Sequence, residues 1–73
     1  MRRIAIFPTT RDVVTSEELC RDAKIKVSVV PTPKSFSKNC GMSLAFDAQD
    51  EQRFVELMKN NNTDVTIYRQ ESF

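Results

Sequence analysis

The stretch IKVSVVPTPKSFSKNCGMSLAF, residues 25–46, decides the fold. Residues 25–29 alternate apolar and polar side chains, which predicts a half-buried β-strand that ends at Pro31. Residues 42–46 form a short apolar run, which predicts another strand. The residues between them, 32–40, predict a loop with two prolines at its base, Pro31 and Pro33. This stretch therefore contributes two successive strands.

A strand and a helix are expected before this stretch. Residues 2–7 are rich in strand-forming side chains and are bounded by Pro8. Thr9, with Asp12 three residues later, resembles a capping box and predicts the start of a helix over residues 10–23. One face of that helix carries Val13, Ser16, Cys20 and Ala23.

A second helix and a final strand are expected after it. Asp47 is predicted to cap the helix, and its apolar stripe is formed by Phe54, Leu57 and Met58. Residues 60–62 are three asparagines, which tolerate the left-handed conformation that ends helices. Residues 65–69 predict the last strand.

The order β-α-β-β-α-β predicts an α+β, ferredoxin-like domain over residues 1–73, a two-layer sandwich. Its four-stranded antiparallel sheet would carry both helices on one face. The residues expected to face the helices are Ile4, Ile6, Ile25, Val27, Val29, Leu44, Val65 and Ile67. Those expected on the other face are Ala5, Phe7, Ser28, Val30, Ser43, Ala45, Thr66 and Tyr68. That second face is small and partly apolar, so a homo-oligomer in which a second subunit covers it is one arrangement we consider.

Composition gives little support for nucleic acid or membrane partners. The net charge is +1. Residues 1–38 hold 8 basic and 4 acidic side chains, and residues 39–73 hold 3 and 6, a difference typical of solvated surface. The apolar run at residues 4–7 is too short for a signal peptide, so we expect a cytoplasmic protein. Phe7 and Tyr68 alone do not make the aromatic surface of an RNA-binding sheet.

The two cysteines are the residues able to do sulfur chemistry. The chain has no histidine, and Cys20 and Cys40 are far apart in sequence, so we expect no zinc site and no other cofactor. A cysteine without histidine also lacks its usual general base, which argues against an enzyme that uses it for nucleophilic hydrolysis. We expect Cys20 to pack in the core, and a disulfide between the two is a less favoured alternative.

Cys40 is the candidate for chemistry because of where the fold would place it. If the strand over residues 42–46 pairs beside the first strand, Cys40 lies close to the start of the first helix. The unpaired N–H groups and the dipole there favour an anion and would lower the thiol pKa. A structural, half-buried thiol is the competing interpretation.

Several polar residues are predicted to surround the sulfur or bind what it carries. They are Thr9, Thr10, Arg11, Lys34, Ser37 and Lys38. Gly41 would let the backbone bend into the strand without crowding the sulfur. Ser35, Ser37 and Asn39 are also able to donate hydrogen bonds to a ligand, but satisfying the backbone of their own loop is the favoured interpretation.

The chain resembles the selenium/sulfur carrier-like family of small bacterial and archaeal proteins. The resemblance rests on FPTT at residues 7–10, PTP at 31–33, SKNCG at 37–41, FD at 46–47 and IYR at 67–69. It departs from the family at Lys24, where glycine is usual, and at Cys20, where an aliphatic residue is usual.

The resemblance implies that Cys40 accepts sulfur or selenium as a persulfide-type adduct and passes it on. The partners would be donor and acceptor proteins. The alternative that we keep is a small binding or regulatory module that oligomerises through the open sheet face.

Overall fold

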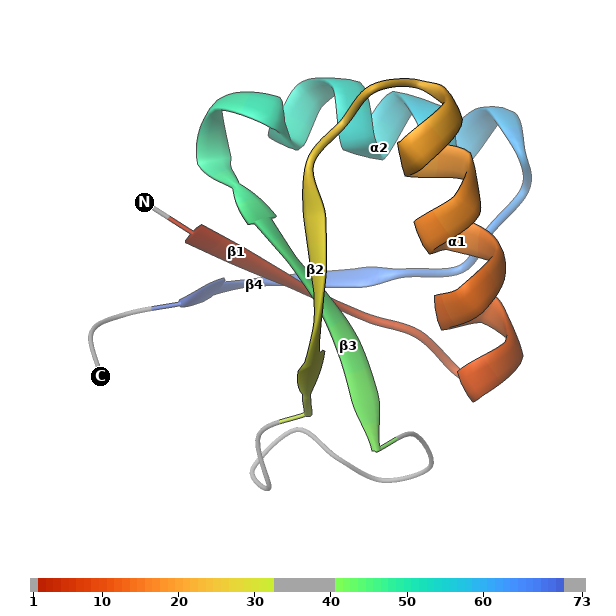
Figure 1. Cartoon of the computed structure of the whole chain (residues 1–73), viewed down its shortest axis with the longest axis vertical. Helices are drawn as coiled ribbons and strands as arrows, with labels where there is room; N and C mark the ends of the chain where they lie inside the picture. Colours follow the sequence, from red (N-terminus) through yellow and green to blue (C-terminus); the bar gives the residue numbers. More distant parts are fainter. Residues whose placement is uncertain (1, 33–40, 71–73) are drawn as a thin grey trace.

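The computed structural model describes residues 2–32 and 41–70, and its elements follow the predicted order (Figure 1). They are β1 (Arg2–Ile6), α1 (Thr10–Asp22), β2 (Val27–Pro31), β3 (Met42–Asp47), a short 3₁₀ helix η1 (Ala48–Asp50), α2 (Glu51–Asn60) and β4 (Thr66–Gln70). The β-α-β-β-α-β order read from the sequence is confirmed.

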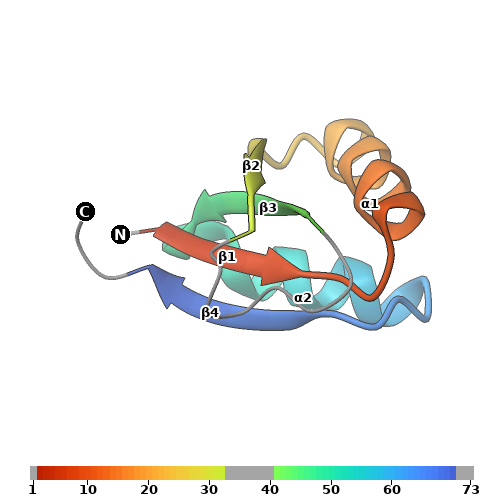
Figure 2. The same ribbon diagram turned by 90° about the horizontal axis from the view of Figure 1, so that it is seen from below.

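The four strands form one sheet in the order β2-β3-β1-β4, and every neighbouring pair is antiparallel. The two strands at the centre are β1 and β3, while β2 and β4 form the edges. Figure 2 shows β1 and β4 in front of α2. The other helix, α1, contacts β2, β3 and α2. The predicted ferredoxin-like α+β architecture is therefore confirmed.

The core fills the space between the helices and one face of the sheet. Its buried members are Ala5, Phe7, Val13, Cys20, Ile25, Leu44, Phe46, Phe54 and Met58. Phe46 of β3 and Phe54 of α2 stack with ring centroids 4.2 Å apart. This stacked pair joins the second helix to the centre of the sheet, and such contacts add to the free energy gained from burial alone.

The prediction for the two faces of β1 was wrong. Ala5 pairs with Leu44 on β3 and with Ile67 on β4, and residues directly opposite each other share a face. Ala5 therefore faces the helices, whereas Ile4 faces the other side. Ile4 is only 4% exposed. Because β1 is buried on both faces, its hydrophobic pattern did not indicate which face meets the helices.

The second strand also differs from the prediction. It runs through Pro31, which pairs with Met42 instead of ending the pairing. The Thr32 N–H donates to the Gly41 carbonyl at 3.0 Å, which makes the pair before it a non-hydrogen-bonded one. The ring nitrogen of Pro31 therefore faces the free edge, where no donor is needed. Val29, predicted to face the core, is 53% exposed because β2 is an edge strand.

The two helices start differently. Thr9 is the N-cap of α1, as predicted, and its hydroxyl oxygen accepts the Asp12 N–H at 3.2 Å. Asp47 caps the 3₁₀ helix η1 instead of α2: its carboxylate accepts the Gln49 N–H at 2.8 Å. Asp50, the N-cap of α2, makes no such side-chain bond. The predicted acidic cap is therefore one turn removed from the regular helix.

Both helices are followed by a residue in the left-handed region. These residues are Lys24, with φ 61°, and Asn62, with φ 52°. Asparagine tolerates this conformation better than lysine does. The Arg53 guanidinium of α2 also donates to the Ala23 carbonyl at 2.9 Å, at the negative end of the α1 dipole. The second helix thus supports the end of the first.

Candidate functional site

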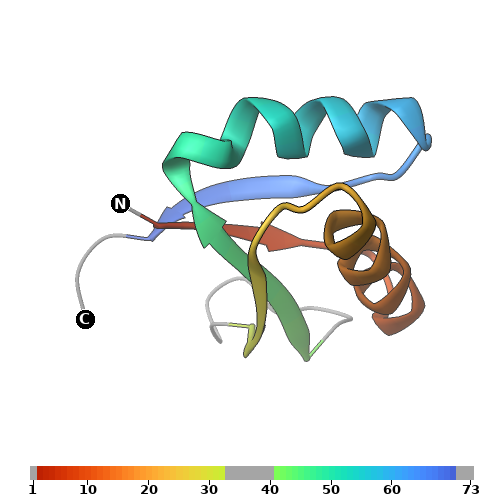
Figure 3. The ribbon, with the colours of Figure 1, turned by 45° about the horizontal axis from the view of Figure 1, so that its top comes forward.

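The fold brings the start of α1 and the start of β3 to the same end of the sheet. The Ala5–Leu44 pair is one residue before the end of β1 and two after the start of β3. The chain turns from β1 into α1 at this end, as Figure 3 shows. Pairing of the two strands, the condition on which the predicted site depended, is confirmed.

Half of the predicted site lies outside the described residues. Cys40, Lys34, Ser37 and Lys38 all belong to residues 33–40. Their proximity to α1 stays a prediction. Gly41, the residue after Cys40, is exposed, and it is joined to Thr32 through its carbonyl.

The start of α1 presents polar groups to solvent. The Thr9 hydroxyl accepts the Asp12 N–H and also lies 3.0 Å from the Asp12 carboxylate, to which it donates. This carboxylate offsets part of the positive end of the dipole. Thr10 and Arg11 are exposed, and Arg11 forms no ion pair with residues 2–32 or 41–70. Arg11 is therefore the cation that this helix end offers to an anion.

Gly41 is not required by its described surroundings. Its φ is not in the left-handed region, and an added Cβ would meet no described heavy atom within 4 Å. The idea that glycine prevents crowding of the sulfur stays a prediction, since the sulfur lies outside the described residues.

A buried pair of hydroxyls at the end of β2 and the start of β3 was missed in the sequence. Thr32 Oγ1 and Ser43 Oγ lie 2.6 Å apart, and Ser43 is fully buried. Both side chains belong to the face of the sheet opposite to the helices. The serine inside the apolar run at residues 42–46 could have indicated this pair in the sequence, because a buried hydroxyl needs a hydrogen-bond partner.

Cys20 occupies the core, as predicted. It is a free thiol, fully buried on α1. Burial, together with the Glu17 carboxylate to a smaller extent, raises the pKa of the Cys20 thiol from its ordinary value of 9.0 to about 11. The reactive species of cysteine is the thiolate, so this thiol is a poor nucleophile at neutral pH. The disulfide alternative is not formed in this structure.

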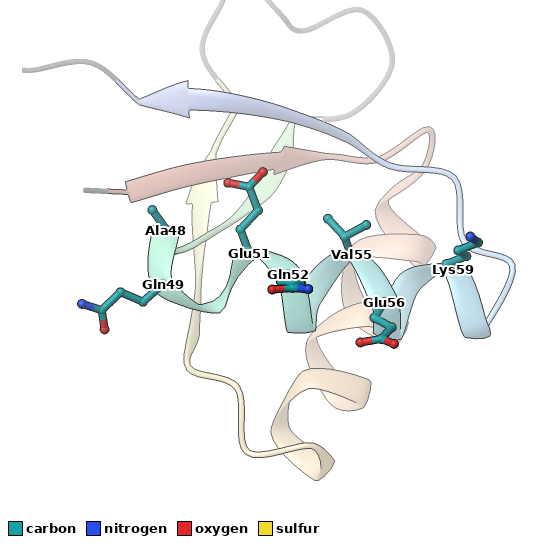
Figure 4. A pocket seen from close by; sticks show the side chains of 7 residues that line it. All are labelled: Ala48, Gln49, Glu51, Gln52, Val55, Glu56 and Lys59. Atoms are coloured by element: carbon teal, nitrogen blue, oxygen red, sulfur yellow. The ribbon is translucent and has the colours of Figure 1, made fainter.

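A shallow groove of about 610 Å³ lies along α2, away from the start of β3 (Figure 4). Its walls are formed by Ala48, Gln49, Glu51, Gln52, Val55, Glu56 and Lys59. Glu51 is directed toward β1 and accepts a 2.7 Å ion-pair hydrogen bond from Arg3 Nε. The groove is lined by no cysteine, and one of its two carboxylates, that of Glu51, already has a partner. It is a weaker candidate than the sheet end.

Metal and membrane features are absent from the part of the chain that the structure describes. Residues 2–32 and 41–70 contain no group of three or more histidine, cysteine or acidic side chains that could hold a metal ion. Within the same residues, neither helix has the length and apolar character needed to cross a bilayer.

Comparison with known proteins gives a family. The model of the family described as "Putative Se/S carrier protein-like" matches residues 2–69. Neither the curated proteins nor the solved structures contain a match. The family match covers nearly the whole chain, including Cys40. The chain therefore belongs to this family, as the sequence motifs indicated.

Proposed function

We propose that this member of the selenium/sulfur carrier-like family carries sulfur or selenium on Cys40. The observation that supports this most is the state of the other thiol. Cys20 is fully buried and its pKa is raised to about 11, so it is unsuited to pick up a sulfur atom. Cys40 is the second of the chain's two cysteines and directly precedes Gly41 in the sequence. Gly41 itself precedes β3, which starts at the end of the sheet where α1 begins.

The chemistry is a transfer between sulfur atoms. The Cys40 thiolate attacks the outer sulfur of a donor persulfide, R–S–SH. The bond from Cys40 Sγ to that sulfur forms, the S–S bond of the donor breaks, and the donor leaves as the thiolate R–S⁻. Cys40 ends as a persulfide, with no external oxidant or reductant. Replacing the outer sulfur of the donor by selenium gives the selenium adduct by the same step.

The start of α1 is the proposed stabiliser of the anions in this step. The N–H groups of its first turn and the Arg11 guanidinium favour a thiolate and a terminal persulfide anion. Thr9 and Thr10 frame this helix end, and we place Lys34, Ser37 and Lys38 in the same role from the loop. The donor and acceptor are proposed to be proteins that dock at this end of the sheet in the cytoplasm. No cofactor takes part.

Mass spectrometry of the loaded protein tests the proposal. The chain would be incubated with a cysteine desulfurase and cysteine, and in a parallel reaction with selenocysteine. We expect one sulfur or selenium atom on Cys40 in the wild type and in Cys20→Ala. No adduct is expected in Cys40→Ser. The proposal fails if Cys40 remains unmodified, or if Cys40→Ser carries as much as the wild type.

A binding or regulatory module that oligomerises through the helix-free sheet face is the second candidate. The observation that favours it is the apolar character of this face, where Ile6 and Val30 are partly exposed beside buried Ile4 and Ala45. Analytical ultracentrifugation of the wild type and Val30→Arg tests it. A dimer that the arginine dissociates would support this module. A monomer at all concentrations would exclude oligomerisation as the function.

A further inference from the structure

The ends of β2 and β3 are joined by two hydrogen bonds from one residue. The Thr32 N–H donates to the Gly41 carbonyl at 3.0 Å, and Thr32 Oγ1 lies 2.6 Å from Ser43 Oγ. The first bond extends the β2–β3 ladder by one step beyond Pro31. The second crosses diagonally to a residue two positions further along β3. Together they fix where the chain leaves β2 and where it enters β3.

Packing alone does not require the hydrogen bond between the Thr32 and Ser43 hydroxyls. Ser43 is fully buried and Thr32 is 9% exposed. At such positions alanine and valine would fill the space without a desolvation penalty, whereas each hydroxyl must find its partner. Two buried hydroxyls that satisfy each other hold one relative position of the strands. Apolar side chains would tolerate small shifts between them.

This bonded pair lies next to the proposed carrier residue in the sequence. Gly41, which accepts the backbone bond, follows Cys40 directly, and Ser43 is three residues from it. Because Cys40 is covalently linked to Gly41, a displacement of Gly41 and the first residues of β3 also displaces Cys40. Small errors in the placement of a reacting group cost large factors in rate.

We propose that Thr32 and Ser43 are positioning residues for Cys40, and that their buried hydroxyl pair sets the reactivity of that thiol. The proposal rests on the proposed function, because it takes Cys40 as the residue that reacts. It assigns no contact between either hydroxyl and the substrate. The pair acts by fixing both ends of residues 33–40 against the sheet.

The test is the rate at which Cys40 alone reacts with iodoacetamide. Cys20→Ala provides a background with one thiol, and rates measured from pH 5 to 10 give both its pKa and the rate of its thiolate. In this background, Thr32→Val and Ser43→Ala each remove one hydroxyl. Thr32→Ser keeps it, and Thr15→Val removes an exposed hydroxyl on α1 as the matched control.

We expect the two hydroxyl-removing variants to change the rate by about threefold or more, or to shift the Cys40 pKa by about half a unit, as a changed charge environment would. Thr32→Ser and Thr15→Val should stay near the background. The double variant Thr32→Val with Ser43→Ala should match the singles, because a second loss from a broken pair adds nothing. Circular dichroism ensures that only folded variants are compared, and having variants at both Thr32 and Ser43 guards against one that fails to fold.

Two outcomes separate this proposal from the carrier function. Unchanged Cys40 rate and pKa in both folded variants would overturn the positioning role, even if the wild type carries sulfur. Altered Cys40 reactivity would support it, even if no sulfur is taken up from the desulfurase, because the alkylation needs no donor.

Discussion

The two halves of the molecule, β1-α1-β2 and β3-α2-β4, have the same element order but fill the core differently. Helix α1 of the first half buries small side chains, namely Val13, Ser16 and Cys20, while Phe7 and Ile25 of the same half lie outside the helix. The α2 half buries the larger Phe54 and Met58. The Ser16 hydroxyl is buried without a partner among the described residues. The comparison teaches that helix α2 brings bulkier side chains to the core than helix α1, whose buried face includes a hydroxyl without a described partner.

Truncation of Phe54 should produce the largest difference between the halves. Phe54→Ala removes a fully buried ring stacked on Phe46 and should lower the free energy of unfolding by about 3–5 kcal/mol. Cys20→Ala, in the same core, should cost on the order of 1 kcal/mol. Urea denaturation measures both.

A domain of this size has a total stability of roughly 4–11 kcal/mol, so Phe54→Ala is able to unfold the chain outright. Phe54→Leu then gives a milder change of about 1.5 kcal/mol or less. Equal losses for Cys20→Ala and Phe54→Ala would contradict the unequal division of the core.

Alkaline pH should weaken the α1 half through Cys20. The folded chain keeps the neutral thiol up to a pKa of about 11, whereas the unfolded thiol ionises near 9.0. Above pH 9 the unfolded state therefore binds fewer protons, and the free energy of unfolding falls as pH rises. The contribution is fully present below pH 9 and is lost through pH 11. A pKa difference of two units corresponds to about 3 kcal/mol in the free energy of unfolding.

Urea denaturation at pH 8, 9, 10 and 11 checks this pH dependence. The wild type is compared with Cys20→Ala, because only the difference between the two proteins reports Cys20. A constant difference across this range would show that the buried thiol does not contribute.

The helix ends should give the smallest difference. Lys24→Gly removes a left-handed lysine after α1 and should stabilise the chain by about 0.5–1 kcal/mol. Asn62→Gly makes the same change after α2, where it should gain only a few tenths of a kcal/mol because asparagine already tolerates this conformation. Thermal unfolding measures both. A larger gain at Asn62 than at Lys24 would reverse the comparison.

Local patterns in the sequence predicted what depends on local physics. Thr9 was identified as a cap because its spacing to Asp12 reflects a bond within one helical turn. Cys20 was assigned to the core from the period of α1. The asparagine triplet correctly indicated the end of α2. The β-α-β-β-α-β order followed from the same kind of pattern.

Features that depend on pairing between strands were not predictable in the same way. The face of β1 that meets the helices is set by the register of Ala5 with Leu44, and both faces of this strand are buried. The Thr32–Ser43 pair joins residues that are distant in sequence and close only after β2 and β3 pair. Asp47 was recognised as a cap, but the intervening 3₁₀ turn was not. The position of Thr9, Thr10 and Arg11 at the start of α1 followed from the cap spacing, whereas their role in a site and the positions of residues 33–40 stay predictions.

The imino nitrogen of Pro31 makes the two borders of the sheet unequal toward other chains. A strand added at the edge of a sheet pairs with a row of backbone N–H and C=O groups. At its last position β2 lacks the N–H donor, because the nitrogen of Pro31 faces outward and carries no hydrogen. The opposite border, β4, contains no proline within Thr66–Gln70. Strand addition, whether in a complex or in aggregation, is therefore directed to β4. The β2 border is left to partners that bind through side chains.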